Sequence, residues 1–467
     1  MPRQKYRVEP PLIRRERTIE LAPGRMQPDD DRLFLGRLAE SGPTKDVWMD
    51  ISREHVLAIV GKRGSGKSFT LGSFIEGQCT TLPETPINHI SKSRAALLFD
   101  TLNIFQWMTA PVGAAASSSH HVQAQLTMLR EWGLSERVEL DVDLWVPAGF
   151  ESRVTSSART FQIRTWDMEV GDWAALLGVD AVQDIMGQLL AQVHEKVTRK
   201  GWSDADGAPQ KPRHEYSLDD LLSCLSGDVD INRDYTPATI RAVRQRLSAY
   251  QSTALFGDLG TPLDQLVRPG RLSILLLSGI PDDLRLVIVG LTIRQLLFSR
   301  AEASEALKTL ELGFAKGERE RDRVQRVLAA APPKTWVFID EAQNIFPSER
   351  HTSASEIFLR FVREGRNFGL SLGFTTQQPS AIDSRIMAQV DTLIAHTLTV
   401  NKDLQTILTN LKSRQPDSIY LKSIKTSLGD AIRQLAVGQA FVSSTDAPRG
   451  LFIDVRPRMS VHGGFEG

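Results

Sequence analysis

Runs of mostly apolar residues recur along the chain and predict strands that are buried on both faces. The clearest runs lie at residues 56–60, 95–99, 272–277, 335–339 and 370–374. Because these runs do not alternate between apolar and polar positions, they predict a mostly parallel sheet. Other segments carry apolar residues at spacings of three and four and predict amphipathic helices, at 180–200, 237–247 and 282–303. We therefore expect an α/β fold.

The first apolar run ends in a glycine-rich loop of the form G-x-x-x-x-G-K-S, and a helix-compatible segment follows it. A strand before and a helix after are the setting of a phosphate-binding loop. Glycines permit close backbone approaches that a Cβ would block, and N–H groups at a helix N-terminus favour anions. The residues predicted to bind the nucleotide are Gly61, Lys62, Arg63, Gly64, Ser65, Gly66, Lys67, Ser68 and Phe69.

A second motif lies where the run at 335–339 ends in two carboxylates, Asp340 and Glu341. This is the Walker B pattern that accompanies a phosphate loop. Asp340 and the hydroxyl of Ser68 are predicted to hold Mg²⁺, and Lys67 to contact the β- and γ-phosphates of ATP. Glu341 is predicted to deprotonate the attacking water, because one carboxylate is occupied by the metal while the other stays free as a base. The two motifs together predict an ATPase.

Asp100 ends another buried run and has two interpretations. Ligands of open α/β sheets bind at the carboxyl ends of the strands, so Asp100 could face the nucleotide and metal. Aspartate also caps turns through its side chain, so it could equally cap the turn that follows. The sequence leaves both interpretations open.

Polar and basic residues that follow the Walker B motif in the sequence are further candidates for a role at the nucleotide. Gln377 follows the run at 370–374 and is predicted to sense the γ-phosphate or to position water. A basic helix is expected at 358–368, and Arg363 or Arg366 could act on a neighbouring subunit's nucleotide as an arginine finger. Each of these arginines could instead be an ordinary surface charge.

The remaining regions flank or interrupt this core. The pattern of residues 33–51 predicts a β-hairpin. Residues 1–32 are rich in Pro and Arg, and we expect them to form an arm that pairs with a neighbour or stays mobile. Short strands at 145–147 and 161–163 are expected at the sheet edge, and the charged segment 317–330 is either a solvated helix face or a DNA-facing element. The predicted organisation is an arm and short hairpin (1–52), the first part of the ATPase core (53–113), a mostly helical insertion (114–265), the second part of the core (266–446) and a C-terminal tail (447–467).

Composition narrows the class of protein. The 467 residues include 56 basic and 56 acidic side chains, so any DNA-binding surface has to be a local patch such as a pore. Two cysteines imply no disulfide framework and favour a reducing cytoplasm. No apolar stretch approaches the length of about 18 residues that spans a membrane. We therefore expect a cytoplasmic protein without a membrane partner.

The order of these motifs resembles the HerA/FtsK group of P-loop ATPases, and within it the HerA-like branch. The resemblance is carried by residues 61–68, 339–344, 363–369, 376–383, 390–396, 401–403, 435–438 and 455–458. It implies a RecA-like core in a hexameric ring that hydrolyses ATP at subunit interfaces and translocates along or unwinds duplex DNA, commonly with a partner nuclease, in end processing or antiphage defence. It also implies that Lys67, Ser68, Asp340, Glu341 and Gln377 keep the nucleotide roles of the family.

The chain departs from the family pattern at several positions. Gln378 stands where the family usually has Arg, Gln343 where it usually has His, and the N-terminal β-barrel is reduced to the hairpin and arm. Two other functions stay open beside the DNA motor. One is an ATPase scaffold or switch that regulates a defence effector without processive unwinding, and the other is a secretion or conjugation motor, which would need a membrane anchor.

Overall fold

The computed structural model describes residues 4–12, 17–80, 87–90, 94–115, 119–138, 140–153, 158–204, 206–251, 253–349, 352 and 354–464. Parts of the predicted arm, insertion and tail, such as residues 13–16, 154–157 and 465–467, lie outside these ranges. Among the described residues, no helix is both long and apolar enough to cross a membrane.

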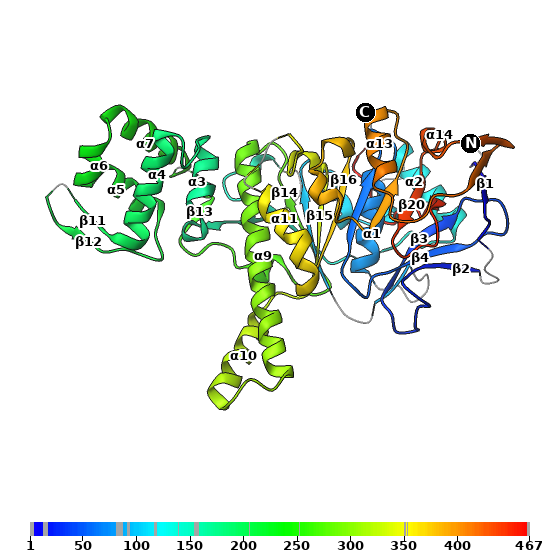
Figure 1. The fold of residues 1–467 in the computed structure, drawn as a ribbon, viewed down its shortest axis with the longest axis horizontal. Coiled ribbons are helices and arrows are strands. Elements are labelled where there is room, and N and C mark those ends of the chain that lie inside the picture. Colours follow the sequence, from blue (N-terminus) through cyan, green and yellow to red (C-terminus); the bar gives the residue numbers. More distant parts are fainter. Residues whose placement is uncertain are drawn as a thin grey trace.

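A large, mostly parallel sheet forms the centre of the molecule and confirms the predicted α/β fold (Figure 1). All five apolar runs are strands in it, and every residue of these strands is buried. The short strands predicted near 145 and 161 are also confirmed, at the edge of the sheet. The parallel strands are β5 (Val56–Val60), β7 (Ala95–Asp100), β8 (Val142–Pro147), β9 (Arg159–Phe161), β14 (Leu272–Leu276), β15 (Thr335–Ile339), β16 (Leu370–Thr376) and β17 (Thr392–Ala395).

The strand order positions the site. It runs β17-β5-β16-β15-β7-β14-β8-β9, so β16 lies between the strand of the phosphate loop and the strand of the Walker B motif. In register, Thr376 pairs with Val60 on one side, and Phe374 pairs with Ile339 on the other. Because the strands are parallel, the residues that follow β5, β15 and β16 meet at one edge of the sheet.

Alternate residues of β5 belong to two hydrophobic clusters, one on each face of the sheet. Leu57 and Ile59 pack with α1 (Lys67–Cys79), whereas Val56, Ala58 and Val60 belong to the cluster that contains α9 (Asp282–Glu311) and α11 (Ser355–Glu364). This double burial explains why the runs contain so few polar positions.

The predicted hairpin is confirmed as an antiparallel pair, and it continues the central sheet instead of forming a separate unit. In the predicted arm, residues 6–9 pair with residues 418–421 and residues 18–21 pair with residues 46–49 of the same chain, so the arm prediction is wrong for these two segments. Tyr6 is fully buried and stacks on Phe452 at 4.1 Å. Six further strands belong to the central sheet: β2 (Thr18–Leu21), β3 (Arg32–Leu38), β4 (Asp46–Asp50), β6 (Asn88–His89), β20 (Gln439–Ser444) and β21 (Leu451–Val455). A separate small sheet contains β1 (Tyr6–Glu9), β18 (Ser418–Leu421) and β19 (Ile424–Thr426).

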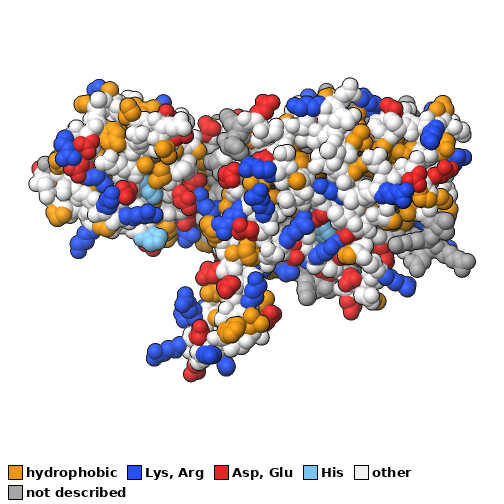
Figure 2. Space-filling model, in the orientation of Figure 1, with side chains coloured by type: hydrophobic (Ala, Val, Ile, Leu, Met, Phe, Trp, Pro, Cys, Tyr) orange, Lys and Arg blue, Asp and Glu red, His pale blue; other side chains and the backbone are white. Residues whose placement is uncertain are grey.

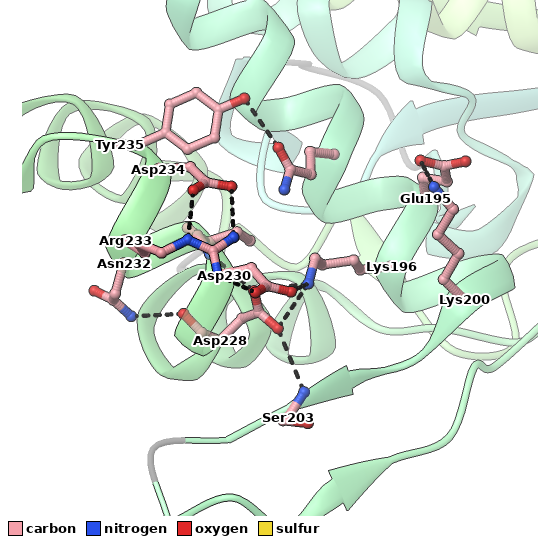
Figure 3. A network of polar contacts seen from close by, with 12 residues as sticks. Glu195, Lys196, Lys200, Ser203, Asp228, Asp230, Asn232, Arg233, Asp234 and Tyr235 are labelled. Atoms are coloured by element: carbon pink, nitrogen blue, oxygen red, sulfur yellow. Dashed lines mark hydrogen bonds and ion pairs between the residues drawn. The ribbon is translucent and has the colours of Figure 1, made fainter.

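A helical lobe lies at one end of the molecule (Figure 1, green). Its first long helix begins at Ile185, five residues later than predicted, because the carboxylate of Asp180 accepts the N–H groups of Val182 and Gln183 in a turn. Lys196 ties the lobe together through ion pairs of 2.9 Å to Asp228 and Asp230 (Figure 3). The lobe comprises α3 (Val170–Leu177), α4 (Ile185–Glu195) with a π-helical turn (Lys196–Lys200), α5 (Leu218–Gly227), α6 (Val229–Asp234), α7 (Pro237–Gln251), β10 (Ile163–Arg164), β11 (Trp202–Ser203), β12 (Pro209–Gln210) and β13 (Phe256–Gly257).

A helical hairpin projects from the body, formed by the second half of α9 and by α10 (Glu318–Ala330) (Figure 1). The amphipathic helix predicted to end at 303 continues to Glu311, and the charged segment is α10, in which only Val324 is buried. Figure 2 shows basic and acidic side chains mixed at the tip, as in a solvated face. The remaining helices are α2 (His120–Trp132), α8 (Leu263–Leu266), α12 (Ser384–Met387), α13 (Asn401–Thr409) and α14 (Leu428–Arg433).

Candidate active site

The glycine-rich loop joins β5 to α1 and depends on glycine at two kinds of position. Gly64 and Gly66 have φ of +71° and +103°, which disfavour any side chain. A Cβ on Gly61 would lie 2.5 Å from Oγ of Ser65 and 2.8 Å from Cβ of His396. Gly66 also begins α1 without a side-chain cap. The first N–H groups of α1 are therefore not taken up by a cap, as an anion site requires.

His396, at the end of β17, packs against the phosphate loop. Its Nδ1 donates to the carbonyl of Gln439 at 2.8 Å, and its Nε2 accepts from the hydroxyl of Thr70 in α1 at 2.9 Å. Burial lowers the pKa of His396 to about 4, which keeps the ring neutral in this arrangement. The sequence signal for His396 was only its place in a segment that resembles the family.

Lys67 is nearly buried at the start of α1, and its Nζ donates to the carbonyl of Lys62 at 3.1 Å. Burial lowers the pKa of Lys67, while the neighbouring carboxylates Glu341 and Asp340 oppose that shift. The ammonium group therefore lies folded onto its own loop and close to the Walker B carboxylates. Phosphate oxygens could replace the carbonyl as its acceptor.

Asp340 lies opposite the loop, and one of its carboxylate oxygens accepts two hydrogen bonds. Oδ1 accepts hydrogen bonds from Ser68 at 3.2 Å and from Thr375. Among the described residues Oδ2 has no hydrogen-bond partner, although Asp340 is completely buried. Burial raises its pKa to about 7, and the charges of Glu341 and Asp100 add to this shift. A buried carboxylate oxygen without a donor, beside a serine hydroxyl, fits a Mg²⁺ ion.

Glu341 follows in a left-handed backbone conformation, with φ 55° and ψ 53°, which is uncommon outside glycine. The hydroxyl of Thr375 accepts its N–H at 3.1 Å. Its carboxylate accepts one side-chain amide on each oxygen, Nε2 of Gln377 on Oε1 and Nε2 of Gln343 on Oε2, both at 2.6 Å. The structure therefore places Gln377 on the carboxylate that is predicted to be the base. In the sequence, Gln343 stands out only as a departure from the family pattern, and no motif marks Thr375.

Asp100 caps the turn after β7. Its carboxylate accepts the N–H groups of Leu102, Ile104 and Phe105, the last at 2.8 Å. Burial nevertheless raises its pKa to about 6. Of the two interpretations of Asp100, the structure supports the turn cap.

The two candidate finger residues have different surroundings. The expected basic helix is α11 followed by a 3₁₀ turn, Gly365–Phe368. Arg366 donates to the carbonyl of Gln389 at 2.7 Å and pairs with Asp391 at 3.1 Å. Arg363 is exposed and has no hydrogen bond or ion pair with the part of the chain that the structure describes.

Phe69, the last predicted nucleotide contact, packs edge-on against His462 at 5.5 Å.

The C-terminal tail is held against α1 by hydrogen bonds to Glu76, which is fully buried. Glu76 accepts hydrogen bonds from Arg456 at 3.2 Å and from both the N–H and the hydroxyl of Ser460 at 2.6 Å. Burial lowers the pKa of Arg458, which lies beside Glu76, to about 10. The helix that carries Lys67 and Ser68 is thus fixed on its far side by the tail.

Comparisons with known proteins show what the chain is similar to. A family model described as "Helicase HerA, central domain" matches residues 33–296, and one described as "Zonular occludens toxin (Zot)" matches residues 285–403. The chain is 25% identical over 277 residues to the DNA double-strand break repair helicase HerA of Pyrococcus furiosus, covering 57% of this chain and 44% of that protein. It is also 25% identical over 185 residues to a probable HerA helicase of Methanocaldococcus jannaschii, covering 37% of this chain and 33% of that protein.

The chain thus matches less than half the length of these relatives. Among solved structures, VirB4 of Thermoanaerobacter pseudethanolicus superimposes with a TM-score of 0.51 at 14% identity, covering 92% of this chain and 98% of that one, which is a likeness of fold. The HerA family model covers more than half of the chain and includes the phosphate loop. The chain therefore belongs to the HerA family of P-loop ATPases, with a RecA-like core.

Proposed function

We propose that this protein hydrolyses ATP with Mg²⁺ at the edge of the central sheet. The observation that carries the proposal is the contact between Ser68 and Asp340, with Glu341 beside it. It brings the end of the phosphate loop, the strand that ends in Asp340 and the base together at one point.

The chain's own residues would divide the work as follows. The loop N–H groups and Lys67 bind the β- and γ-phosphates and balance their charge. Ser68 and Asp340 would hold Mg²⁺, which when bound neutralises charge on the phosphates. Glu341 orients the attacking water and accepts its proton, and Gln377 positions the γ-phosphate or the water.

We further propose that the active subunits form a hexameric ring and that Arg363 of one subunit completes the neighbour's site. Arg363 is the better candidate because it is exposed and unpaired among the described residues, whereas Arg366 is held by Asp391. An arginine finger contributes about 10³- to 10⁵-fold in rate. Such a contribution would tie turnover to assembly.

The ring would translocate along or unwind duplex DNA, in the cytoplasm and together with a partner nuclease or other effector. Two relatives named as double-strand break repair helicases support this class of substrate. The balanced charge of the chain supports a local DNA-binding surface over a wholly basic one.

The experiment that tests this function measures the mass of the assembled protein and its release of phosphate from ATP. Purified protein is sized by light scattering with and without ATP and duplex DNA, while phosphate release is followed and a triplex-displacement assay reports translocation. A ring whose turnover rises with duplex DNA and which displaces the third strand supports the motor. A ring with turnover but no displacement would instead point to the scaffold or switch, and absence of turnover would refute the ATPase.

A further inference from the structure

Thr375 and Thr376 end β16, and together with Gln377, which follows them, they contact the segment that follows β15. Thr375 contacts Asp340 and the N–H of Glu341, Thr376 contacts Gln343, and Gln377 contacts the carboxylate of Glu341. The proposed role of Gln377 at the γ-phosphate accounts for only one of the two amides on that carboxylate. Gln343 supplies the other.

The orientation of the Gln343 amide is fixed by its own partner. The hydroxyl of Thr376 donates to Oε1 of Gln343 at 2.8 Å. With its oxygen engaged there, Gln343 presents its Nε2 to Oε2 of Glu341 at 2.6 Å. The carboxylate can only accept hydrogen bonds, so this amide orientation is the one that Glu341 requires.

We propose that Gln343 is a positioning residue for Glu341, which holds Oε2 while Gln377 leaves Oε1 for the γ-phosphate of bound ATP. The proposal rests on the ATPase function proposed above. In the structure each carboxylate oxygen of Glu341 accepts a hydrogen bond from one amide, so the plane of the carboxylate is fixed. When Gln377 turns to the phosphate, Oε1 becomes the oxygen that accepts the proton of the attacking water, and Gln343 alone keeps the carboxylate from rotating.

The effect of losing Gln343 should appear in kcat and not in ATP binding. Gln343 has no contact with the phosphate loop among its described hydrogen bonds, so the KM for ATP should stay within about twofold of the wild type. A misplacement of about 1 Å in a reacting group costs about 10²-fold. We therefore expect kcat of Gln343→Leu to fall by about 10- to 100-fold.

The experiment measures kcat, KM and ATP affinity for Gln343→Leu, Thr376→Val and the double variant. Thr376→Val should lower kcat less, and the double variant should be no slower than Gln343→Leu, because Thr376 acts through Gln343. Gln378→Leu is the matched control, since Gln378 is an exposed glutamine next to Gln377, and its kcat should not change. Thr376→Val and calorimetric ATP binding keep the test decisive if Gln343→Leu folds poorly.

Unchanged kcat in Gln343→Leu, an equal change in kcat and KM, or multiplicative losses in the double variant would overturn the proposal. Wild-type protein that binds ATP without any turnover would overturn the ATPase function and this proposal with it. Normal wild-type turnover with an unaffected Gln343→Leu variant would overturn the positioning role alone.

Discussion

The hydroxyl of Ser68 donates a hydrogen bond of 3.2 Å to Oδ1 of Asp340, across 272 positions of the chain. This contact leaves Oδ2 of the same carboxylate buried and without a described partner. The strand order brings the two residues together, because β16 lies between β5 and β15 and the residues after all three strands meet at one edge.

Asp340→Asn should abolish the dependence of nucleotide binding on Mg²⁺. A neutral amide cannot replace a carboxylate as a ligand of this hard cation, so added Mg²⁺ should no longer tighten ATP binding. Calorimetry of ATP binding with Mg²⁺ and with EDTA measures the effect. Asp417→Asn, at an exposed aspartate, is the control and should retain the wild-type difference. Equal Mg²⁺ dependence in both variants would contradict the metal assignment.

Glu341→Gln should lower ATP turnover by about 10²- to 10⁴-fold and leave ATP binding and the ring intact. The amide keeps the size of the side chain but cannot accept a proton. Phosphate release and light scattering in the presence of ATP measure the two effects. Glu349→Gln, at an exposed glutamate eight positions later, should behave as wild type. Residual wild-type hydrolysis in Glu341→Gln would refute its role as the base.

Arg363→Ala should lower turnover by about 10³- to 10⁵-fold without weakening ATP binding, because the arginine is predicted to act on a neighbour. Mixing Arg363→Ala with Lys67→Ala subunits should restore part of the activity, since a Lys67→Ala subunit supplies the arginine to an intact site. Arg360→Ala, which removes an exposed ion pair with Glu364, is the control. Mixed rings as inactive as either parent would argue against a finger in trans.

Glu76→Gln should destabilise the folded protein by about 3–5 kcal/mol, because it leaves the buried guanidinium groups of Arg456 and Arg458 without their carboxylate. The free energy of unfolding in urea, or the melting temperature, measures the loss. Glu302→Gln, at an exposed position of α9, should change stability by less than about 0.5 kcal/mol. Equal stability of the two variants would show that the tail is not fixed through Glu76.

The stability of the folded protein should contain a term from His396 that falls as the pH falls. Its folded-state pKa is about 4, below the ordinary value of 6.5, so the unfolded chain takes up a proton between pH 6.5 and 4 that the folded protein does not. This difference costs about 3 kcal/mol once the pH is below 4 and nothing above pH 7. Unfolding free energies at pH 7 and pH 5 should therefore differ less in His396→Gln than in the wild type, and equal differences would contradict the prediction.

The sequence by itself determined the α/β fold, the phosphate loop and the Walker B pair. These features are local, since a buried strand needs an unbroken apolar run and a phosphate loop needs glycine, Lys67 and Ser68 in consecutive positions. The turn cap at Asp100 is also local, yet the sequence could not choose it, because a carboxylate at a strand end serves a cap or a ligand equally well.

Only the tertiary structure decided which side chains surround these motifs. The contacts of His396 with Thr70, of Thr376 with Gln343 and of Arg366 with Asp391 each join two different elements of the fold. Such contacts follow from strand order and register, which apolar runs do not encode because each run could fill any buried place in the sheet. The described N-terminal residues lie against the sheet for the same reason, since their few apolar side chains find partners such as Phe452 only in the folded chain.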